Sequence, residues 1–452
     1  MSYSNEVLRE DLRAKVKPEL QPTKKRIMDN WSYFASFMGG CVSIGTFSTG
    51  ASLLGVLNMT QAILAMFIGC AVISVAMALI GEAGHRYGIP FSVHLRPSFG
   101  TAGAKVPALL RAIPAIVWFG FQSWVGAGAI NMSLKVLFGF DHLPTVYVLF
   151  TIVQILLSIN GFRGIKWLEN ISSVFILGTL GYMFYVAKTR YAIEIGKTVG
   201  DIAGTWGLPF WAGTAAFLGI YATMIINSSD YARELKHETG RGRTSVIYIL
   251  SILPVTLFMG LIGLMVSGAT GNSDPVQVFA TTLGSPVLTV ITLLFVAFAQ
   301  VTTNTLNNVL PPVYVFMDTF GLRYKASTWL VGILSIAVFP WKLVTAESAA
   351  GLNLFIKIYS AFLGPIFAVM VTDYYILRKQ KLNVNELYDL EGTFKGVNWA
   401  GILAIFIGAA CSFTFLEISW YVSLVPTMLS YALLMKCLPS ARRFRAGEVS
   451  EG

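Results

Sequence analysis

One apolar stretch combines two indole rings with a primary amide. The segment VWFGFQSWVGAG, residues 117–128, places Gln122 four residues after Trp118 and two before Trp124. Residues four apart share one face of a helix, so Trp118 and Gln122 are expected side by side. An aromatic ring can stack on a flat ring compound, and an amide can offer both a hydrogen-bond donor and an acceptor to the edge of that compound. The pair favours recognition of a neutral planar heterocycle. The alternative is a glutamine that bonds a neighbouring helix beside packing tryptophans.

A second charge-free stretch carries adjacent hydroxyl groups. In FAQVTTNTLNNVLPP, residues 298–312, Thr302 and Thr303 precede Asn308 by less than two turns. Hydroxyl and free carbonyl oxygens are hard ligands that suit a small cation. The glycine-rich segment at 34–52, FASFMGGCVSIGTFSTGAS, can supply such carbonyls if its helix is interrupted. The alternative is that each threonine bonds back to a carbonyl of its own helix.

The elements that must hold these residues are membrane-spanning helices. Apolar residues make up 55% of the 452 and charged residues only 12%, with a mean hydropathy of +0.66. This composition is typical of a polytopic membrane protein, in which each span needs about 20 apolar residues. Twelve such segments are predicted: 31–57, 60–82, 106–136, 144–163, 168–187, 205–229, 245–268, 286–316, 326–345, 351–376, 399–417 and 418–438.

Basic residues predict the orientation of these segments. Most of the 33 Lys and Arg residues fall in residues 1–30, in alternate connections such as 378–395, and after residue 435. Positive loops stay on the cytoplasmic side, so both termini are expected on the cytoplasmic side of the cell membrane. The net charge of +10 then reflects topology rather than binding of a nucleic acid polymer. The first residues show no secretory signal.

Motifs for other kinds of site are missing. The four cysteines have no paired spacing and are expected to be packing residues, so neither a disulfide framework nor a zinc site is indicated. They are Cys41, Cys70, Cys411 and Cys437. No HExxH, GxSxG or Walker sequence appears, so the chain is not expected to be an enzyme or to hold a cofactor.

Polar and glycine residues recur in the sixth predicted span. FLGIYATMIINSSDYARE has Gly219 in mid-span and Asn227 near its end. Interrupted helices at corresponding positions of two repeats mark the midplane site of many transporters. The first and sixth spans stand five apart, which predicts two inverted repeats of five helices followed by two further helices. The alternative is that the small residues only let helices approach closely.

Seven motifs in a consistent order resemble the nucleobase:cation symporter-1 family, and most of all its bacterial hydantoin and allantoin branch. They are RYGIPFSVHLRPSFG, WFGFQSW, NSSDYARE, TTNTLNN, FPWKL, LGPIFAVMVTDYYILRK and GVNW. The resemblance extends from about residue 31 to 437. It implies the leucine-transporter architecture, alternating access, and uptake of a flat nitrogen heterocycle such as a nucleobase, hydantoin or allantoin with sodium or protons.

The resemblance also implies how the chain is divided. Residues 1–30 are a cytoplasmic tail, 31–187 the first five-helix repeat, and 188–377 the second. Residues 378–438 are a cytoplasmic loop with the last two helices, and 439–452 a cytoplasmic tail.

Carried over position by position, the resemblance implies a substrate site and a sodium site. The aromatic of the third span falls on Trp118, its amide-reading glutamine on Gln122, and the asparagine of the eighth span on Asn308. The second stacking aromatic, usually tryptophan in this branch, falls on Tyr221, and a glutamine of the hydantoin carrier falls on Ser43. The sodium ligands, three carbonyls and two hydroxyls, fall on Gly39, Val42, Ala299, Thr302 and Thr303.

Spans one, three, six and eight are expected to carry no charge at membrane depth. This favours a neutral substrate and favours sodium over protons as the coupling ion, because nothing near the site can titrate. The expected partners are a small heterocycle, the coupling cation and the lipid bilayer. An amino-acid or osmolyte carrier of the same fold, or a proton-coupled permease, stays open as an alternative.

Overall fold

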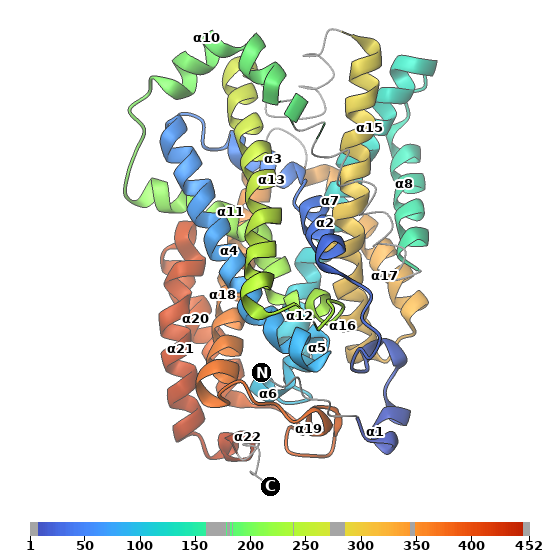
Figure 1. Cartoon of the computed structure of the whole chain (residues 1–452), viewed down its shortest axis with the longest axis vertical. Helices are drawn as coiled ribbons and strands as arrows, with labels where there is room; N and C mark the ends of the chain where they lie inside the picture. The colour runs from blue at the N-terminus through green and yellow to red at the C-terminus, as the bar shows by residue number, and fades with distance from the viewer. Residues whose placement is uncertain are drawn as a thin grey trace.

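The computed structural model shows a protein built from helices (Figure 1). It describes residues 8–159, 178, 181–182, 184–237, 239–271, 285–343 and 349–445. Within these ranges, the one strand-like pairing is a single bridge between Met28 and Leu235. The all-helical class expected from the sequence is therefore confirmed.

Long apolar helices occupy the predicted segments. In the described ranges, seven are long and apolar enough to cross a membrane: Met59–Tyr87 (α4), Lys105–Phe138 (α7), Leu208–Ile226 (α11), Gly242–Thr270 (in α13, Arg241–Thr270), Pro286–Phe320, Gly351–Leu377 and Leu416–Cys437. Two shorter apolar helices are Leu143–Ser158 (α8) and Trp399–Thr414 (α20). The predicted segment 168–187 lies mostly outside the described residues, as do the ends of 144–163 and 326–345. The count of twelve stays a prediction.

The remaining helices connect or extend these spans. The last three long stretches contain α15 (Pro286–Thr303), α16 (Leu310–Phe320), α18 (Ala349–Val371) and α21 (Ser419–Cys437), and α17 is Tyr324–Ala337. The short helices are α1 (Glu10–Lys15), α5 (Phe91–His94), α6 (Arg96–Phe99), α10 (Ala192–Ile195), α12 (Ser228–Ala232), α19 (Val384–Tyr388) and α22 (Arg442–Arg445).

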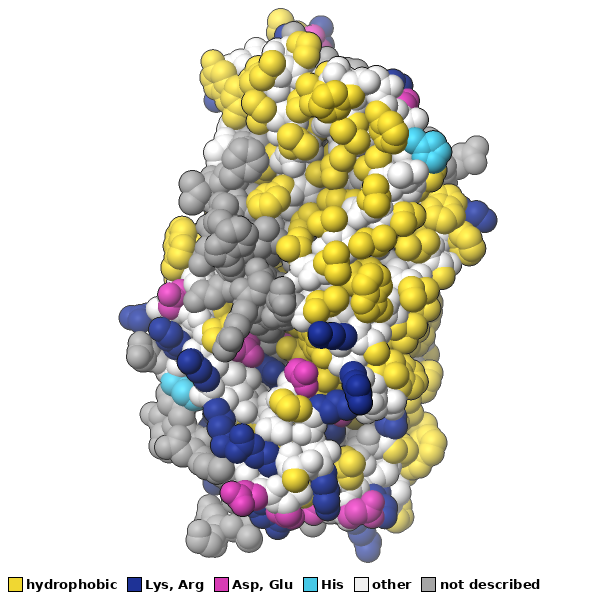
Figure 2. All heavy atoms as spheres, turned by 90° about the vertical axis from the view of Figure 1, so that its right-hand side faces the viewer, with side chains coloured by type: hydrophobic (Ala, Val, Ile, Leu, Met, Phe, Trp, Pro, Cys, Tyr) yellow, Lys and Arg dark blue, Asp and Glu magenta, His cyan; other side chains and the backbone are white. Residues whose placement is uncertain are grey.

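Apolar and basic side chains occupy different parts of the surface. Hydrophobic side chains cover the upper and middle parts of the face shown in Figure 2, whereas Lys and Arg gather in its lower part. The lower end in Figure 1 also holds α1, α19 and α22, so the described segments closest to the two termini lie at the same end. A broad apolar side surface bounded by a charged end is what a bilayer requires of a spanning protein.

The predicted first span is interrupted, as expected. It forms α2 (Asn30–Gly40) and α3 (Ile44–Ala51), which are separated by residues 41–43. Ser43 caps the second helix, because its side chain accepts a hydrogen bond from the Gly45 backbone N–H at 3.1 Å. The interruption leaves backbone carbonyls of the first helix without partners in their own helix.

The interruption of the sixth span differs from the expectation. Helix α11 runs without a break through Gly219, and the chain departs from helical geometry only at Asn227, before α12. Gly219 serves close packing instead, since a Cβ there would lie 2.8 Å from Cγ2 of Ile356 in α18. The glycine is therefore a contact residue and not a helix breaker, which is the alternative that the sequence left open.

A wider π-helical turn, Asn304–Val309, joins α15 to α16. Pro311 follows it and has no backbone N–H to donate to the carbonyl of Asn307, four residues earlier. That carbonyl accepts a hydrogen bond from Nη2 of Arg111 instead, at 2.9 Å. Such turns are frequent where a helix carries function, because they aim side chains and carbonyls out of the regular ladder.

The helices pack as two groups with a cavity between them. One group contains α2, α3, α4, α11, α12 and α13, and the other contains α7, α8, α15, α16 and α17. Helix α18 contacts members of both groups, while α20 and α21 pack against α18 and against each other.

Candidate functional site

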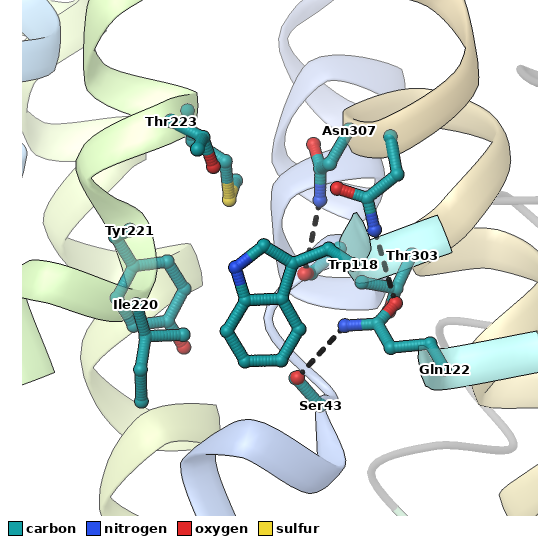
Figure 3. A pocket seen from close by; sticks show the side chains of 11 residues that line it. Ser43, Trp118, Gln122, Ile220, Tyr221, Thr223, Thr303 and Asn307 are labelled. Atoms are coloured by element: carbon teal, nitrogen blue, oxygen red, sulfur yellow. Dashed lines mark hydrogen bonds between the residues drawn. The ribbon is translucent and has the colours of Figure 1, made fainter. Parts of the chain in front are cut away.

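The cavity between the two groups has about 300 Å³ of empty space (Figure 3). All five residues that the sequence placed at a substrate site line it, together with residues that the sequence did not single out for this role. The lining residues are Gly40, Ser43, Trp118, Gln122, Ile220, Tyr221, Thr223, Met224, Thr303, Asn307 and Asn308. They come from the interruption of the first span, from α7 and α11, and from the end of α15 with its π-helical turn.

The indole of Trp118 lies in the middle of this cavity, between Tyr221 and Gln122 (Figure 3). Its Nε1 donates to the hydroxyl of Tyr359 at 3.1 Å, and this hydroxyl donates to the carbonyl of Gly219 at 2.9 Å. One edge of the ring packs on Gly45, where a Cβ would lie 2.8 Å from Cη2 of the indole. The ring is thus held at its nitrogen and its rim.

Three polar side chains form one wall of the cavity. Nε2 of Gln122 donates to Oγ of Ser43 at 3.0 Å, and Oε1 of Gln122 accepts from Nδ2 of Asn308 at 3.2 Å (Figure 3). The structure therefore brings together the three residues that the sequence placed in three different spans. Because all three are neutral, the wall can read a neutral edge without a charge to desolvate.

Tyr221 contributes its ring to the cavity but not its hydroxyl. The hydroxyl lies 2.8 Å from Oγ1 of Thr256 and 3.3 Å from the Cys41 carbonyl, to which it donates. It also lies 3.3 Å from Oγ1 of Thr46. These partners belong to α13 and to the first span, so the phenol ties α11 to both of them.

The predicted cation ligands form two hydrogen-bonded sets. Oγ1 of Thr303 lies 3.2 Å from the Gly39 carbonyl and 3.0 Å from the Val42 carbonyl. Oγ1 of Thr302 donates at 2.9 Å to the carbonyl of Ala299, one turn earlier in its own helix. Both carbonyls of the first set lie at the C-terminal end of α2, where the helix dipole favours a cation. The second set has the back-bonded geometry that the sequence left open as an alternative.

The third span carries a buried charge near one of its ends. Arg111 of α7 is fully buried, with 0% of its surface exposed. Its Nε and Nη2 both donate to Oδ1 of Asn227, at 2.8 and 2.5 Å. In the described residues its Nη1 has no partner. The arginine lies near the start of α7, where a basic residue in the sequence indicates the end of a span. Its burial by Asn227 and Asn307 is visible only in the fold.

A buried carboxylate belongs to the same region. Oδ1 of Asp230 in α12 accepts from the Phe91 backbone N–H at 2.8 Å, while Oδ2 has no partner in the described ranges. Burial raises the pKa of this carboxyl to about 6, against the opposing effects of that N–H, Arg233 and Arg111. Asp230 was not among the residues that the sequence placed at the site.

The raised pKa of Asp230 predicts a pH-dependent stability. Because the folded pKa of about 6 exceeds the ordinary pKa of an aspartate carboxyl, 3.8, the stabilising contribution is complete below the lower value and is lost as pH rises through the higher one. Asp230→Asn should abolish this loss. Denaturation can be measured from about pH 4 to pH 7. Over this range, the free energy of unfolding of the variant should rise relative to that of the wild type. An unchanged difference across this range would contradict the assignment.

Sequence reasoning missed several residues that shape the site. Asn304 and Asn307 stand in the same charge-free motif as Asn308, and Gln154 is a lone amide in an apolar segment, which is the signal that identified Gln122. Tyr359 carried no such signal, because tyrosine is common in packed cores and in interfacial belts.

Known proteins resemble this chain along nearly all its length. The family model described as "Permease for cytosine/purines, uracil, thiamine, allantoin" matches residues 21–435. An allantoin permease of Bacillus subtilis is 30% identical over 455 residues, covering 90% of either chain. A hydantoin permease of Microbacterium maritypicum is 25% identical over 445 residues, covering 94% of this chain and 90% of its own.

Two solved structures share the fold. Mhp1, a nucleobase-cation-symport-1 family transporter in a closed conformation with bromovinylhydantoin bound, superimposes with a TM-score of 0.85 at 24% identity. The alignment covers 96% of this chain and 99% of that one. A Na⁺-coupled sialic acid symporter gives a TM-score of 0.67 at 11% identity, covering 94% and 92%. At these identities the likeness concerns the fold alone.

Proposed function

Because the chain belongs to the family of permeases for cytosine and purines, uracil, thiamine and allantoin, we propose that it imports a neutral planar nitrogen heterocycle together with a cation. Membership makes it a membrane-embedded transporter and not an enzyme. Its relatives are named for allantoin, hydantoin, and purines with uracil, which are all nitrogen-containing ring compounds.

The observation that carries the proposal is the set of hydrogen-bonding groups left free at the cavity wall. In the described part of the chain, Oδ1 of Asn308 accepts no hydrogen bond, and one proton of the Gln122 amide has no acceptor. Oγ of Ser43 accepts from both Gln122 and Gly45, so its own proton is free. One acceptor beside two donors complements a neutral N–H and C=O edge.

Aromatic residues supply the other half of the recognition. Trp118 and the ring of Tyr221 line the same cavity, and stacking on such rings contributes about 0.5–1.5 kcal/mol beyond burial. An amino-acid or osmolyte carrier would leave this combination of indole and amides without a role.

Sodium is the proposed coupling ion. The carbonyls of Gly39 and Val42 and the hydroxyls of Thr302 and Thr303 offer neutral oxygen ligands, with the carbonyl of Ala299 as the fifth. Thr303 also lines the substrate cavity, and Val42 directly precedes Ser43. An ion that orders residues 39–43 would therefore place Ser43 for the substrate, and the substrate would stabilise the ion site in return.

A proton-coupled mechanism has one observation in its favour. Asp230 is buried, has one unpartnered oxygen among the described residues, and has a pKa raised by burial to about 6. It is not a lining residue of the cavity, whereas Thr303 is. Sodium coupling is therefore the better supported of the two.

Alternating access is the proposed transport mechanism, with the two helix groups moving against each other. On the Arg111 side of the cavity, contacts cross between the groups from Arg111 to Asn227 and from Asn307 to Gly40 and Tyr231. These contacts must break for release on that side.

We further propose twelve helices as two inverted repeats, 31–187 and 188–377, with 378–438 appended, and tails 1–30 and 439–452 on the cytoplasmic side of the cell membrane.

A thermal-stability screen of the detergent-purified protein tests the proposal. The ligands are uracil, cytosine, thymine, purines, hydantoins, allantoin and several amino acids, each in sodium and in potassium. A ligand at 100 times its dissociation constant adds about 2.7 kcal/mol to the free energy of unfolding. We expect stabilisation by a ring compound, stronger in sodium. A response only to an amino acid would overturn the proposed substrate class.

A further inference from the structure

Gln154 of α8 lies outside the cavity but is joined to it by hydrogen bonds. It is fully buried and contacts Asn304 of the π-helical turn, where Nδ2 of Asn304 donates to Oε1 of Gln154 at 2.8 Å. Asn304 in turn contacts Asn308, and Asn308 contacts Gln122. Two buried residues without contact to the cavity thus form a continuous chain of amides with two residues that line it.

The orientation of the first amide is set by the backbone. Nε2 of Gln154 lies 3.3 Å from the Phe150 carbonyl and 2.9 Å from Oγ of Ser123. A backbone carbonyl can only accept a hydrogen bond, so the NH₂ end of the Gln154 amide must face Phe150. Its Oε1 therefore has to face Asn304, and only a donor satisfies it there.

This orientation is passed along the chain of amides. Asn304 uses both protons of Nδ2, one to Gln154 and one to Ser123 at 3.2 Å, so its Oδ1 is the end that meets Asn308. Asn308 then uses both protons of its own Nδ2, to Oδ1 of Asn304 at 2.9 Å and to Oε1 of Gln122 at 3.2 Å. Turning over any one of these amides would set oxygen against oxygen in a buried site.

The far end of the chain agrees with the near end. Nε2 of Gln122 donates to Oγ of Ser43, which also accepts from the Gly45 backbone N–H. A backbone N–H can only donate, so Oγ of Ser43 accepts from Gly45, and its second lone pair accepts from Gln122. The direction of the chain is therefore set by the obligate acceptor at Phe150, and the contacts at Ser43 are compatible with that direction.

We propose that Gln154 and Asn304 are positioning residues that set the order of donor and acceptor presented to the substrate. Through them, Asn308 offers its oxygen to an N–H group and Gln122 offers an N–H to a C=O group. This inference rests on the proposed function, since it concerns how the same cavity selects its ligand. It predicts that a substrate must present an N–H at the position that Asn308 reads.

The test compares a ring compound that binds wild type with its mono-N-methylated derivatives. In wild type, the derivative that blocks the N–H read by Asn308 should bind at least about tenfold more weakly than the parent, because it leaves the buried oxygen unpaired. In Gln154→Leu, the amides of Asn304 and Asn308 are free to turn over. The ratio of the parent's affinity to that of the derivative should then fall toward one. A purely structural role of Gln154 would weaken both ligands equally and leave the ratio unchanged.

Two control variants sharpen the comparison. In Gln154→Glu, a protonated carboxyl donates to the Phe150 carbonyl and keeps an acceptor facing Asn304, so this variant should retain the wild-type ratio. Gln300→Leu removes another buried glutamine, whose Nε2 donates only to the Val296 carbonyl of its own helix in the described residues, and should also retain it. Asn304→Ser interrupts the same chain of amides at its second member, and the affinity ratio should again fall toward one. It therefore replaces Gln154→Leu if that variant does not fold.

The outcomes separate this inference from the function on which it rests. Binding of the parent compound by wild type, with a ratio unchanged in both Gln154→Leu and Asn304→Ser, overturns the positioning role alone. Absence of binding by any ring compound to wild type overturns the proposed function and this inference together. Loss of the ratio in the two interrupting variants but not in the two controls supports it.

Discussion

Replacing Thr303 by alanine is expected to make ligand binding independent of sodium. The Thr303 hydroxyl is the described side-chain oxygen that joins the Gly39 and Val42 carbonyls to α15. Without it, sodium loses a ligand, and the interrupted first span loses this link to α15. Couplings between binding sites are commonly about 1–3 kcal/mol, so the wild-type affinity in sodium should exceed that in potassium by about 5- to 150-fold. Isothermal titration in the two salts measures the ratio.

Two variants separate a lost ion ligand from general damage. Thr303→Ser keeps the hydroxyl and should keep the sodium dependence. Thr305→Ala removes a buried threonine that bonds back to the Val301 carbonyl at 2.9 Å, and it should leave the dependence intact. Thr303→Ala should also retain the affinity that wild type shows in potassium. Sodium dependence that survives in Thr303→Ala would refute the assignment of Thr303.

Removing the indole of Trp118 is expected to weaken ligand binding by about 100-fold or more, since both burial and stacking are lost. The ring lies in the middle of the cavity (Figure 3). It is held there by the Tyr359 hydroxyl. Trp118→Phe should recover part of the loss because a smaller ring still stacks. Dissociation constants measured in sodium provide the comparison.

Trp124 is a matched control on the same helix. It packs edge-on against Tyr147 and at a tilt against Trp341, at ring-centroid distances of 5.2 and 5.6 Å, and does not line the cavity. Trp124→Ala should therefore lower stability and leave the dissociation constant nearly unchanged. Equal losses of affinity in Trp124→Ala and Trp118→Ala would mean that the indole of Trp118 has no special role in recognition.

Much of the fold follows from local sequence, because the bilayer accepts few solutions. A spanning segment must satisfy its backbone hydrogen bonds internally, so a long apolar run predicts a helix wherever it occurs. The glycines and small polar residues around Ser43 also predicted an interrupted helix correctly. The break predicted at Gly219 was wrong. A glycine that breaks a helix and a glycine that lets a neighbour such as Ile356 approach have the same local sequence signature.

The candidate site divides in a similar way. Spacing along one helix placed Trp118 and Gln122 on a common face, and the family resemblance added Ser43, Tyr221 and Asn308; the structure arranges all five around one cavity. Their roles with a substrate stay proposals. The burial of Arg111 under Asn227 could not be predicted, because a basic residue near a helix end has the same sequence signature whether it faces solvent or another helix.

What sequence determines here is which residues are apolar, which are polar without charge, and how they are spaced along each helix. The orientation of each amide depends on partners that lie far apart in the chain. Gln154 and Asn304 are separated by 150 positions and meet because α8 packs against the π-helical turn. Hydrogen bonds have direction, and burial removes the water that would otherwise satisfy either orientation. Donor and acceptor at the cavity wall are therefore assigned by packing between helices and not by the residues alone.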